Sequence, residues 1–216
     1  MTSVGSSFRR IAGFSPKCKI FRAFSAQTQG KPLSRKDAES LSSMLRVDHA
    51  GELAAYQIYS GQVFVLSRTH PELVPLIKEM QDQESHHLNT FNNLLAKHRV
   101  RPTVMTPLWT IAGWGLGAAT AALGKEAAMA CTSAVETVIG EHYDDQVRKL
   151  MELEKKYPDG GEMTQLTDTV SKFRDDELEH RDIAIERDAE KAPGYPILEQ
   201  IIGAGCRAAI WISERA

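Results

Sequence analysis

The sequence has little cysteine and lacks the motifs of several common enzyme classes. Its 216 residues include three cysteines, Cys18, Cys131 and Cys206, and none of them forms a C-x-x-C pair. This argues against a thiolate metal or redox site and indicates buried, unreactive thiols in a reducing compartment. The sequence contains neither a P-loop nor a Ser-His-Asp grouping. The string from Gly113 to Ala118 matches G-x-G-x-x-A, but no strand precedes it, so a dinucleotide-binding fold is not expected.

Strand-type alternation of apolar and polar residues is also absent. Apolar residues instead recur at spacings of three and four along most of the chain, which predicts an all-α fold. Proline and glycine clusters break this pattern at four places, at 69–71, 100–107, 157–161 and 192–194. The expected helices span about 36–67, 71–98, a stretch that carries Glu136 and ends near 153, 163–189, and a last one after Gly194. The simplest arrangement is a four-helix bundle with an additional C-terminal helix.

Acidic residues are missing from residues 1–36, which hold eight lysines or arginines. Residues 6–14 are rich in serine, carry two arginines and are amphipathic, a profile typical of a mitochondrial transit peptide. We therefore expect residues 1–36 to be a transit peptide and disordered lead-in, cleaved near 22–25, and residues 37–216 to form one domain. A disordered basic tail is the alternative. The domain that follows is acidic, so nucleic acid is not expected as a partner.

One short pattern occurs twice, far apart in the chain. Residues 82–87 and 175–180 both read D-x-E-x-x-H. Glu-x-x-His on a helix places a carboxylate and an imidazole on one face, about one turn apart. Two such helices, with one Glu from each of two further helices, make the inward ligand set of a di-iron or di-manganese carboxylate bundle. Glu52 and Glu136 are the expected single ligands.

The flanks of the two motifs repeat as well. Glu52 precedes the first E-x-x-H glutamate by 32 residues, and Glu136 precedes the second by 41. Tyr59 follows Glu52 by seven residues, and Tyr143 follows Glu136 by seven, so each tyrosine shares a helical stripe with its glutamate. We interpret the chain as two related helix pairs, each supplying E…E-x-x-H.

The predicted ligand set has four carboxylates and two imidazoles. Its members are Glu52, Glu84, His87, Glu136, Glu177 and His180. This composition favours iron or manganese over zinc, which usually takes fewer ligands and often thiolates. Asp48 and Asp176 are expected to hydrogen-bond ligand histidines and fix their tautomers, with solvated or inter-helix ion pairs as the alternative.

Charge is absent from residues 104–124, a run of 21 residues that is long enough to span a bilayer. A single crossing here would put Glu84 and Glu136 on opposite sides of the membrane, where they could not share a site. We expect the segment to lie at the membrane interface, where Trp109 and Trp114 are suitable anchors, to re-enter, or to pack inside the protein. The alternative is a helix of small residues packed closely on a neighbour.

Longer strings identify a resemblance. The string R-V-D-H-A-G-E at 46–52, both E-x-x-H motifs, and the stretch V-E-x-x-I-x-x-H-Y at 135–143 together resemble the demethoxyubiquinone hydroxylases. These are mitochondrial members of the ferritin-like di-iron carboxylate superfamily, and the similarity covers roughly residues 40–216. The resemblance implies a ferritin-like bundle in which the six residues named above bind two iron ions. Departures at 53–54 and at Thr137 do not touch a predicted ligand.

The resemblance also implies a reaction. It is hydroxylation of the demethoxyubiquinone ring by O₂, with two electrons that come ultimately from NADH. The expected substrate is a polyprenyl benzoquinone, the expected location is the matrix side of the mitochondrial inner membrane, and a lipid-binding protein of the ubiquinone-biosynthesis complex is an expected partner. His142, Tyr143 and Tyr59 are expected to contact the quinone or to relay electrons and protons. Buried, hydrogen-bonded aromatic residues are the alternative for all three.

Other functions fit the same ligands. Iron storage or ferroxidase activity would use the same bundle but predicts a polar shell without a long apolar segment. A non-catalytic scaffold of a ubiquinone-synthesis complex predicts that metal removal leaves quinone levels unchanged. A manganese catalase is compatible with the ligands alone.

Overall fold

The computed structural model describes residues 32–158 and 161–216. Most of the predicted transit peptide and lead-in, with Cys18, lies outside these ranges. The described residues form helices and no strand, which confirms the predicted all-α class. The α-helices are α2 (Arg35–Thr69), α3 (Val74–His98), α4 (Thr106–Ala122), α5 (Lys125–Lys156), α6 (Glu162–Glu186) and α7 (Tyr195–Ser213). Two short 3₁₀ segments, η1 (Pro71–Leu73) and η2 (Ala189–Lys191), connect α2 to α3 and α6 to α7.

The helix boundaries agree with the sequence pattern within about three residues, apart from one predicted loop. α4 begins at Thr106, inside the stretch 100–107 that was expected to be a loop, and Pro107 occupies its first turn. Proline is tolerated there because the first N–H groups of a helix have no intrahelical acceptor. The uncharged segment is therefore a helix. Among the described helices, none combines the length and the apolar content needed to cross a bilayer.

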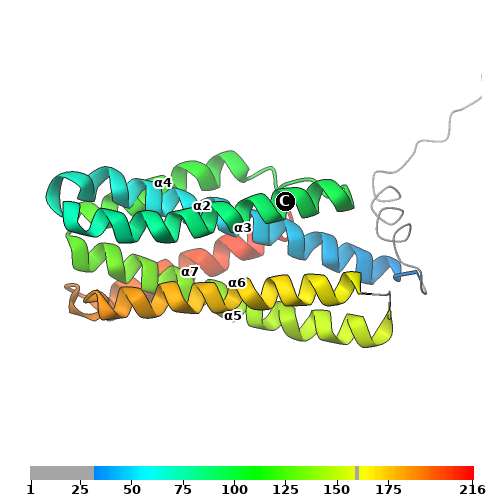
Figure 1. Ribbon diagram of the computed structural model, residues 1–216. Coiled ribbons are helices and arrows are strands. Elements are labelled where there is room, and N and C mark those ends of the chain that lie inside the picture. The colour runs from blue at the N-terminus through cyan, green and yellow to red at the C-terminus, as the bar shows by residue number, and fades with distance from the viewer. Residues whose placement is uncertain (1–31, 159–160) are drawn as a thin grey trace, which may run out of the picture.

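The bundle is built from two similar halves, which are stacked in Figure 1. The first half runs from α2 to α4 and the second from α5 to α7. Within each half, two long helices form a hairpin, α2 with α3 and α5 with α6, and a third apolar helix returns to pack on the first. α4 packs against α2, and α7 packs against α5. The two helix pairs predicted from the repeated motif thus each carry an additional helix.

Glycines bring α4 unusually close to α2. A Cβ atom at Gly117 would run into the backbone of Ile58, and one at Gly61 would run into the backbone of Trp114. A Cβ at Gly113 would lie 2.7 Å from the Ala54 carbonyl oxygen. Small residues at such positions let two helix backbones approach directly. This is the close packing that the sequence offered as the alternative for residues 104–124.

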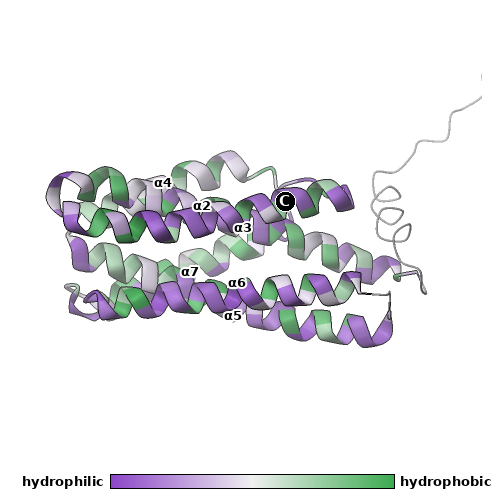
Figure 2. Cartoon of the chain, in the orientation of Figure 1, coloured by the Kyte–Doolittle hydropathy of each residue, from purple (hydrophilic) through white to green (hydrophobic). Residues whose placement is uncertain are grey.

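The outward faces of α4 and α7 remain apolar. Large exposed side chains include Leu108, Ile111 and Trp114 on α4, and Ile197, Ile201 and Trp211 on α7. In Figure 2, purple hydrophilic residues recur along α3 and α6, whereas α7 is mainly white and green. The molecule therefore has a polar side formed by α3 and α6 and an apolar side formed by the third helix of each half.

Three apolar clusters occupy the interior of the described bundle, and two of them are the larger. One contains Leu41, Phe91 and Phe173, and the other contains Ile77 and Met129, with all five side chains almost completely buried. Burial of such side chains contributes most of the stabilisation of a helical bundle. The regular spacing of apolar residues along each helix is thereby explained by packing, and the polar residues that remain buried require a separate explanation.

Candidate metal centre

The six predicted ligands come together inside the bundle. Glu52 lies on α2, Glu84 and His87 on α3, Glu136 on α5, and Glu177 and His180 on α6. Each has a relative exposure of 2% or less. Four carboxylates in one dry place repel one another and lose hydration, which is unfavourable unless cations compensate for both losses.

Two overlapping groups within this cluster have the geometry of metal sites. The first comprises Glu52, Glu84, His87 and Glu177, and the second comprises Glu84, Glu136, Glu177 and His180. In each group the potential ligand atoms all lie within 4.8 Å of one another. Glu84 and Glu177 belong to both groups. Two neighbouring cations, with two carboxylates shared between them and one carboxylate and one imidazole each, match this arrangement.

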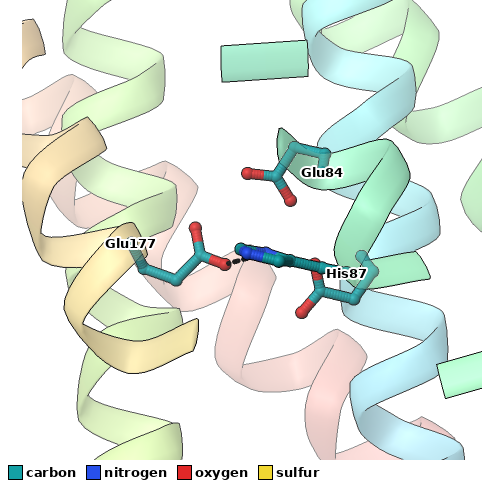
Figure 3. A group of neighbouring side chains, drawn as sticks. Glu84, His87 and Glu177 are labelled. Atoms are coloured by element: carbon teal, nitrogen blue, oxygen red, sulfur yellow. Dashed lines mark ion pairs between the residues drawn. The ribbon is translucent and has the colours of Figure 1, made fainter. Parts of the chain in front are cut away.

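The imidazoles are oriented toward the carboxylates through Nδ1. His87 Nδ1 lies 3.3 Å from Glu52 Oε2 and 3.3 Å from Glu177 Oε1. Figure 3 shows Glu84 and Glu177 pointing toward His87 from α3 and α6, with the His87–Glu177 pair dashed. His180 Nδ1 lies 3.0 Å from Glu84 Oε1 and 3.4 Å from Glu177 Oε2. Both Nδ1 atoms thus face the centre.

The opposite nitrogen of each imidazole is held by a neighbouring side chain. His87 Nε2 lies 3.1 Å from Asp176 Oδ2, and His180 Nε2 lies 2.5 Å from Gln83 Oε1. An acceptor at Nε2 places the proton there and leaves Nδ1 free as a ligand. The structure brings Asp176 to a ligand histidine as expected. Gln83 was missed, although it precedes Glu84 as Asp176 precedes Glu177 and the repeat could have indicated it.

Unpaired polar atoms concentrate at the centre. Among the described residues, eight buried atoms of the six side chains have no hydrogen-bond partner. They are Glu52 Oε2, both Glu84 oxygens, His87 Nδ1, Glu136 Oε2, both Glu177 oxygens and His180 Nδ1. A buried polar group without a partner costs free energy, and a bound cation would compensate for eight such atoms in one place. Oxygen and imidazole donors without thiolates fit iron or manganese.

Burial and mutual repulsion shift the acid–base behaviour of the carboxylates. Burial, followed by the charge on Glu177, raises the pKa of Glu84 and Glu136 well above the usual range. Burial also raises the pKa of Glu52. Burial acts on Glu177 in the same sense, but the close imidazoles of His180 and His87 outweigh it and hold its pKa at about 2. Without a metal, burial and repulsion therefore favour the protonated forms of Glu52, Glu84 and Glu136.

Each predicted tyrosine binds a glutamate of the other half. The Tyr59 hydroxyl donates to Glu136 Oε1 at 2.8 Å, and the Tyr143 hydroxyl donates to Glu52 Oε1. Both rings are almost completely buried. The sequence placed each tyrosine on the same stripe as its own glutamate, and the fold crosses the two pairs. Their hydrogen bonds satisfy one oxygen of each single carboxylate and leave the other oxygen for a cation.

Asp48 does not contact a ligand histidine. Its Oδ1 accepts a hydrogen bond from Gln146 Nε2 at 2.6 Å and lies 3.5 Å from His142 Nε2. The expected role of Asp48 in orienting a ligand histidine is therefore not seen. Helical spacing placed Asp48 correctly on the face of Glu52, but the partner depends on how α2 and α5 are rotated against each other. His142 belongs to this buried polar group and not to the metal cluster.

An apolar cleft of about 320 Å³ leads from the side of α4 and α7 toward the centre. It is bounded by α2, α4, α5 and α7, and its lining is mostly alanine, glycine and aliphatic residues. Asp48, His142 and Tyr143 are its inner polar or aromatic residues, and Trp109 lies among the lining residues of α4. Because Tyr143 bonds Glu52, the cleft adjoins the cluster of six candidate ligands. The bundle thus joins a buried polar centre to an apolar entrance.

The chain is similar in sequence to known proteins. A family model described as "Ubiquinone biosynthesis protein COQ7" matches residues 39–213. The human "NADPH-dependent 3-demethoxyubiquinone 3-hydroxylase, mitochondrial" is 50% identical over 189 residues, which is 88% of this chain and 84% of the relative. The "5-demethoxyubiquinone hydroxylase, mitochondrial" of Saccharomyces cerevisiae is 48% identical over 219 residues, 94% of each.

A bacterial relative is similar as well. The "3-demethoxyubiquinol 3-hydroxylase" of Rhodospirillum rubrum is 46% identical over 178 residues, 82% of this chain and 79% of the relative. The resemblance predicted from the motifs is confirmed by these matches, which extend over nearly all of the described bundle. The chain belongs to the COQ7 family of ubiquinone biosynthesis proteins.

Proposed function

We propose that this protein is a di-iron monooxygenase that hydroxylates the ring of a demethoxyubiquinone or demethoxyubiquinol. The observation that carries the proposal is the junction of a buried four-carboxylate, two-histidine cluster with an apolar cleft. Membership of a family whose relatives are named as hydroxylases of this ring supports it. The reaction converts a ring C–H to C–OH. One oxygen atom of O₂ enters the product and the other leaves as water, with two electrons and two protons consumed.

The six clustered residues are the proposed iron ligands. Glu52 with His87 and Glu136 with His180 would each hold one ion, and Glu84 and Glu177 would lie between the two. A bound iron pair supplies the electrons for O₂ activation and a means of transferring oxygen to the ring. Tyr59 and Tyr143 keep the single carboxylates in place through their hydroxyl groups. The surrounding apolar side chains exclude water from the reacting ring.

The apolar cleft is the proposed route of the substrate. A benzoquinone with a polyprenyl tail is too apolar to cross the polar side formed by α3 and α6. The cleft opens between α4 and α7 and reaches Tyr143, which adjoins Glu52. We expect the ring to enter first and the tail to remain along the small residues of α4 and α7. His142 and Tyr143 would then contact the ring, and Tyr59 lies on the far side of the centre.

The protein is proposed to bind the matrix face of the mitochondrial inner membrane. Exposed Ile111 and Trp114 on α4 and Ile197, Ile201 and Trp211 on α7 would lie in the interface. The human and yeast relatives are named mitochondrial, in keeping with this location. The same apolar side would also suit a lipid-binding partner protein that presents the quinone.

The electron donor is proposed to be a reduced nicotinamide nucleotide. The sequence resemblance implies NADH, whereas the human relative is named as NADPH-dependent. Parallel assays with the two nucleotides at equal concentration would decide between them. A change of electron donor would leave the metal ligands and the substrate route of the proposal unaltered.

The decisive experiment reconstitutes the protein with ferrous iron under nitrogen. A demethoxyquinone analogue, a nicotinamide nucleotide and O₂ are then added, and the hydroxylated product is measured by mass spectrometry. With isotopically labelled O₂, one labelled oxygen atom should appear in each product molecule. A double variant, Glu84→Ala with Glu177→Ala, should form no product. Product at the wild-type rate from the double variant would refute the di-iron proposal.

The apolar cleft also bears on the iron-storage alternative. An iron-storage protein requires a polar path for hydrated ions, but the cleft that adjoins Glu52 is lined mainly by aliphatic and small residues. Iron oxidation without any dependence on the quinone, and mineral growth beyond two ions per chain, would favour storage. A scaffold function would be favoured if the protein formed no product and metal removal left quinone levels unchanged.

A further inference from the structure

One buried acid in the apolar cleft is unexplained by the metal centre. Asp48 is 3% exposed and lies among apolar lining residues of α2, α4 and α7. Its Oδ1 accepts a hydrogen bond from Gln146 Nε2 at 2.6 Å, and the same amide nitrogen lies 2.7 Å from His142 Nε2. Asp48 Oδ2 is buried and has no hydrogen-bond partner within the described ranges. An acid in this position is costly unless something pairs with it.

The second half of the bundle contains the corresponding pair without the acid. Asp48 precedes Glu52 by four residues and Thr132 precedes Glu136 by four. Gln146 and Gln62 each follow the respective glutamate by ten.

The hydrogen bonds match this correspondence. Gln62 Nε2 donates to Thr132 Oγ1 at 3.2 Å, just as Gln146 Nε2 donates to Asp48 Oδ1. The position of His142 is occupied in the first half by the aliphatic Ile58, six residues after Glu52. The fold is therefore satisfied by a threonine, a glutamine and an aliphatic residue at this place.

The Asp48–Gln146 pair contains polar groups that the Thr132–Gln62 pair lacks. Both pairs leave the glutamine Oε1 buried without a partner in the described structure, so that feature is common to the two halves. Asp48 Oδ2 and the His142 ring are present on one side only, and that side lines the cleft. The second half shows that the helix contact itself requires neither of these groups, and a buried carboxylate oxygen without a partner is costly. The additional polar groups therefore point to a ligand in the cleft.

The position of Asp48 suits a ligand that also reaches the metal centre. Asp48 lies one helical turn before Glu52 on the same face of α2, about 6 Å along the axis. Tyr143, which bonds Glu52, and His142 are adjacent on α5 and both line the cleft. A flat ring held at Asp48 would thus lie beside the Glu52 end of the cluster, between α2 and α5.

We propose that Asp48, held by Gln146 and His142, forms a hydrogen bond to one ring oxygen of the quinone and so sets which ring carbon faces the metal centre. This rests on the proposed function. Burial raises the pKa of the Asp48 carboxyl, against the opposing effect of His142 and Gln146, which favours a carboxyl that donates to a carbonyl oxygen. A polyprenyl chain without the quinone ring has no oxygen that could accept a hydrogen bond from Asp48, so Asp48 would not increase its affinity.

The test is a binding cycle with two ligands. The first is a short-tail demethoxyquinone, and the second is a benzene with the same substituents but without the two ring oxygens. Calorimetric titration of the full-length, iron-loaded protein under nitrogen gives both affinities without turnover. The wild-type protein should bind the quinone about tenfold more tightly than the oxygen-free ring, the value of one good buried hydrogen bond.

Three variants complete the cycle. Asp48→Thr copies the second half, where the fold already accepts threonine, and should reduce the tenfold preference to less than about threefold. Asp48→Asn keeps a donor and an acceptor and should retain most of the preference. Thr132→Ala removes the corresponding hydroxyl of the second half and should keep the preference in full. Product analysis of Asp48→Thr should show a lower yield per electron pair consumed, because the ring is held less well.

Two results would overturn the inference alone. One is an unchanged preference for the quinone in Asp48→Thr. The other is an equal loss of affinity for both ligands, which would indicate a structural role. In both cases the wild-type protein still binds and hydroxylates the quinone, so the proposed function survives. If the wild-type protein binds neither ligand and forms no product, the substrate class itself is wrong and the inference falls with it.

Discussion

Each half of the molecule supplies the metal centre with two glutamates and one histidine. The first half contributes Glu52, Glu84 and His87, and the second contributes Glu136, Glu177 and His180. The groups around these ligands differ between the halves. His87 is held by a carboxylate and His180 by an amide. The candidate ligands are thus of the same types in both halves, whereas the side chains that hold the two imidazoles differ.

The third helices show the same contrast. α4 packs on α2 through glycines whose Cβ atoms would strike backbone, whereas a Cβ at Gly203 of α7 would meet the flexible end of Arg207 at 3.1 Å and Val138 at 3.5 Å. The first half therefore has a rigid, close helix contact and the second a more tolerant one. The cleft lies between these two helices, so one of its walls is fixed and the other has room to adjust.

The strongest test of the symmetric centre separates shared from unshared ligands. Glu177→Ala should bind neither ion stably and give product only at background level, because both metal groups include Glu177. Glu52→Ala should retain one ion, since it belongs to one group. Iron per chain, measured by elemental analysis after desalting, distinguishes these outcomes. Glu179→Ala, an exposed change on the same helix, is the control and should keep two ions. Two ions in Glu177→Ala would contradict the shared role.

Metal removal should make stability depend strongly on pH. Glu84, Glu136 and Glu52 have raised pKa values in the fold, so they take up protons on folding, and their contribution is lost as the pH rises above about 4.5. The close carboxylates of Glu177 and Glu52 outweigh burial and raise the pKa of His87 to about 10, so its contribution is lost between about 6.5 and 10. Glu177, with a pKa of about 2, loses its contribution only below about 4.5.

The measurement is thermal unfolding of chelated and iron-loaded protein from pH 5 to pH 9. The Tm of the chelated protein should fall as the pH rises, and iron should raise the Tm by on the order of 10 °C at pH 8. The difference in Tm between the iron-loaded and the chelated protein should become smaller toward pH 5, because protons then replace the cations. A chelated protein that is more stable at pH 9 than at pH 6 would show that the buried carboxylates are not protonated in the fold.

Matched glycine substitutions compare the two third helices. Gly117→Ala should destabilise the protein by about 3 kcal/mol, because neither backbone can move aside. Gly203→Ala should change the free energy of unfolding by less than about 1 kcal/mol, since Arg207 can shift and alanine favours the helix. Denaturant unfolding at fixed metal loading gives both values. Equal effects would mean that the two contacts are equally tight.

The unequal groups behind the histidines predict inequivalent ions. A carboxylate that accepts the Nε2 proton makes the imidazole a more strongly electron-donating metal ligand than an amide oxygen in the same place. The ion beside His87 should therefore differ from the ion beside His180. Asp176→Gln gives His87 the kind of partner that His180 has, and should make the two Mössbauer doublets of the iron-loaded protein more alike. It should weaken iron binding by about tenfold. Doublets that coincide already in the wild-type protein would refute this asymmetry.

The sequence was sufficient to predict the all-α class and which six side chains would meet. The class follows from helical periodicity, and the six side chains follow from the repeated D-x-E-x-x-H motif and its flanks, matched to the ligand pattern of a carboxylate bundle. The assignment of these residues as iron ligands stays a prediction. The membrane-interface role of residues 104–124 also stays a prediction. The close packing of α4 on α2, which the sequence offered as the alternative, is observed at Gly113 and Gly117.

What the sequence could not predict depends on the relation between helices. Tyr143 bonds Glu52 and Tyr59 bonds Glu136 because α2 and α5 lie opposite each other, and no spacing within one helix contains that information. Asp48 was assigned to a ligand histidine for the same reason and instead meets Gln146. Periodicity places a residue on a face, whereas the rotation and axial offset of the neighbouring helix decide which atom it meets.

The central claim is that six side chains hold two neighbouring cations with two carboxylates in common. Anomalous diffraction at the iron edge, from crystals of the iron-loaded protein, tests it most directly. Two peaks should appear inside the bundle, one beside Glu52 and His87 and the other beside Glu136 and His180, with Glu84 and Glu177 between them. A single peak, or iron bound only outside this cluster, would contradict the account.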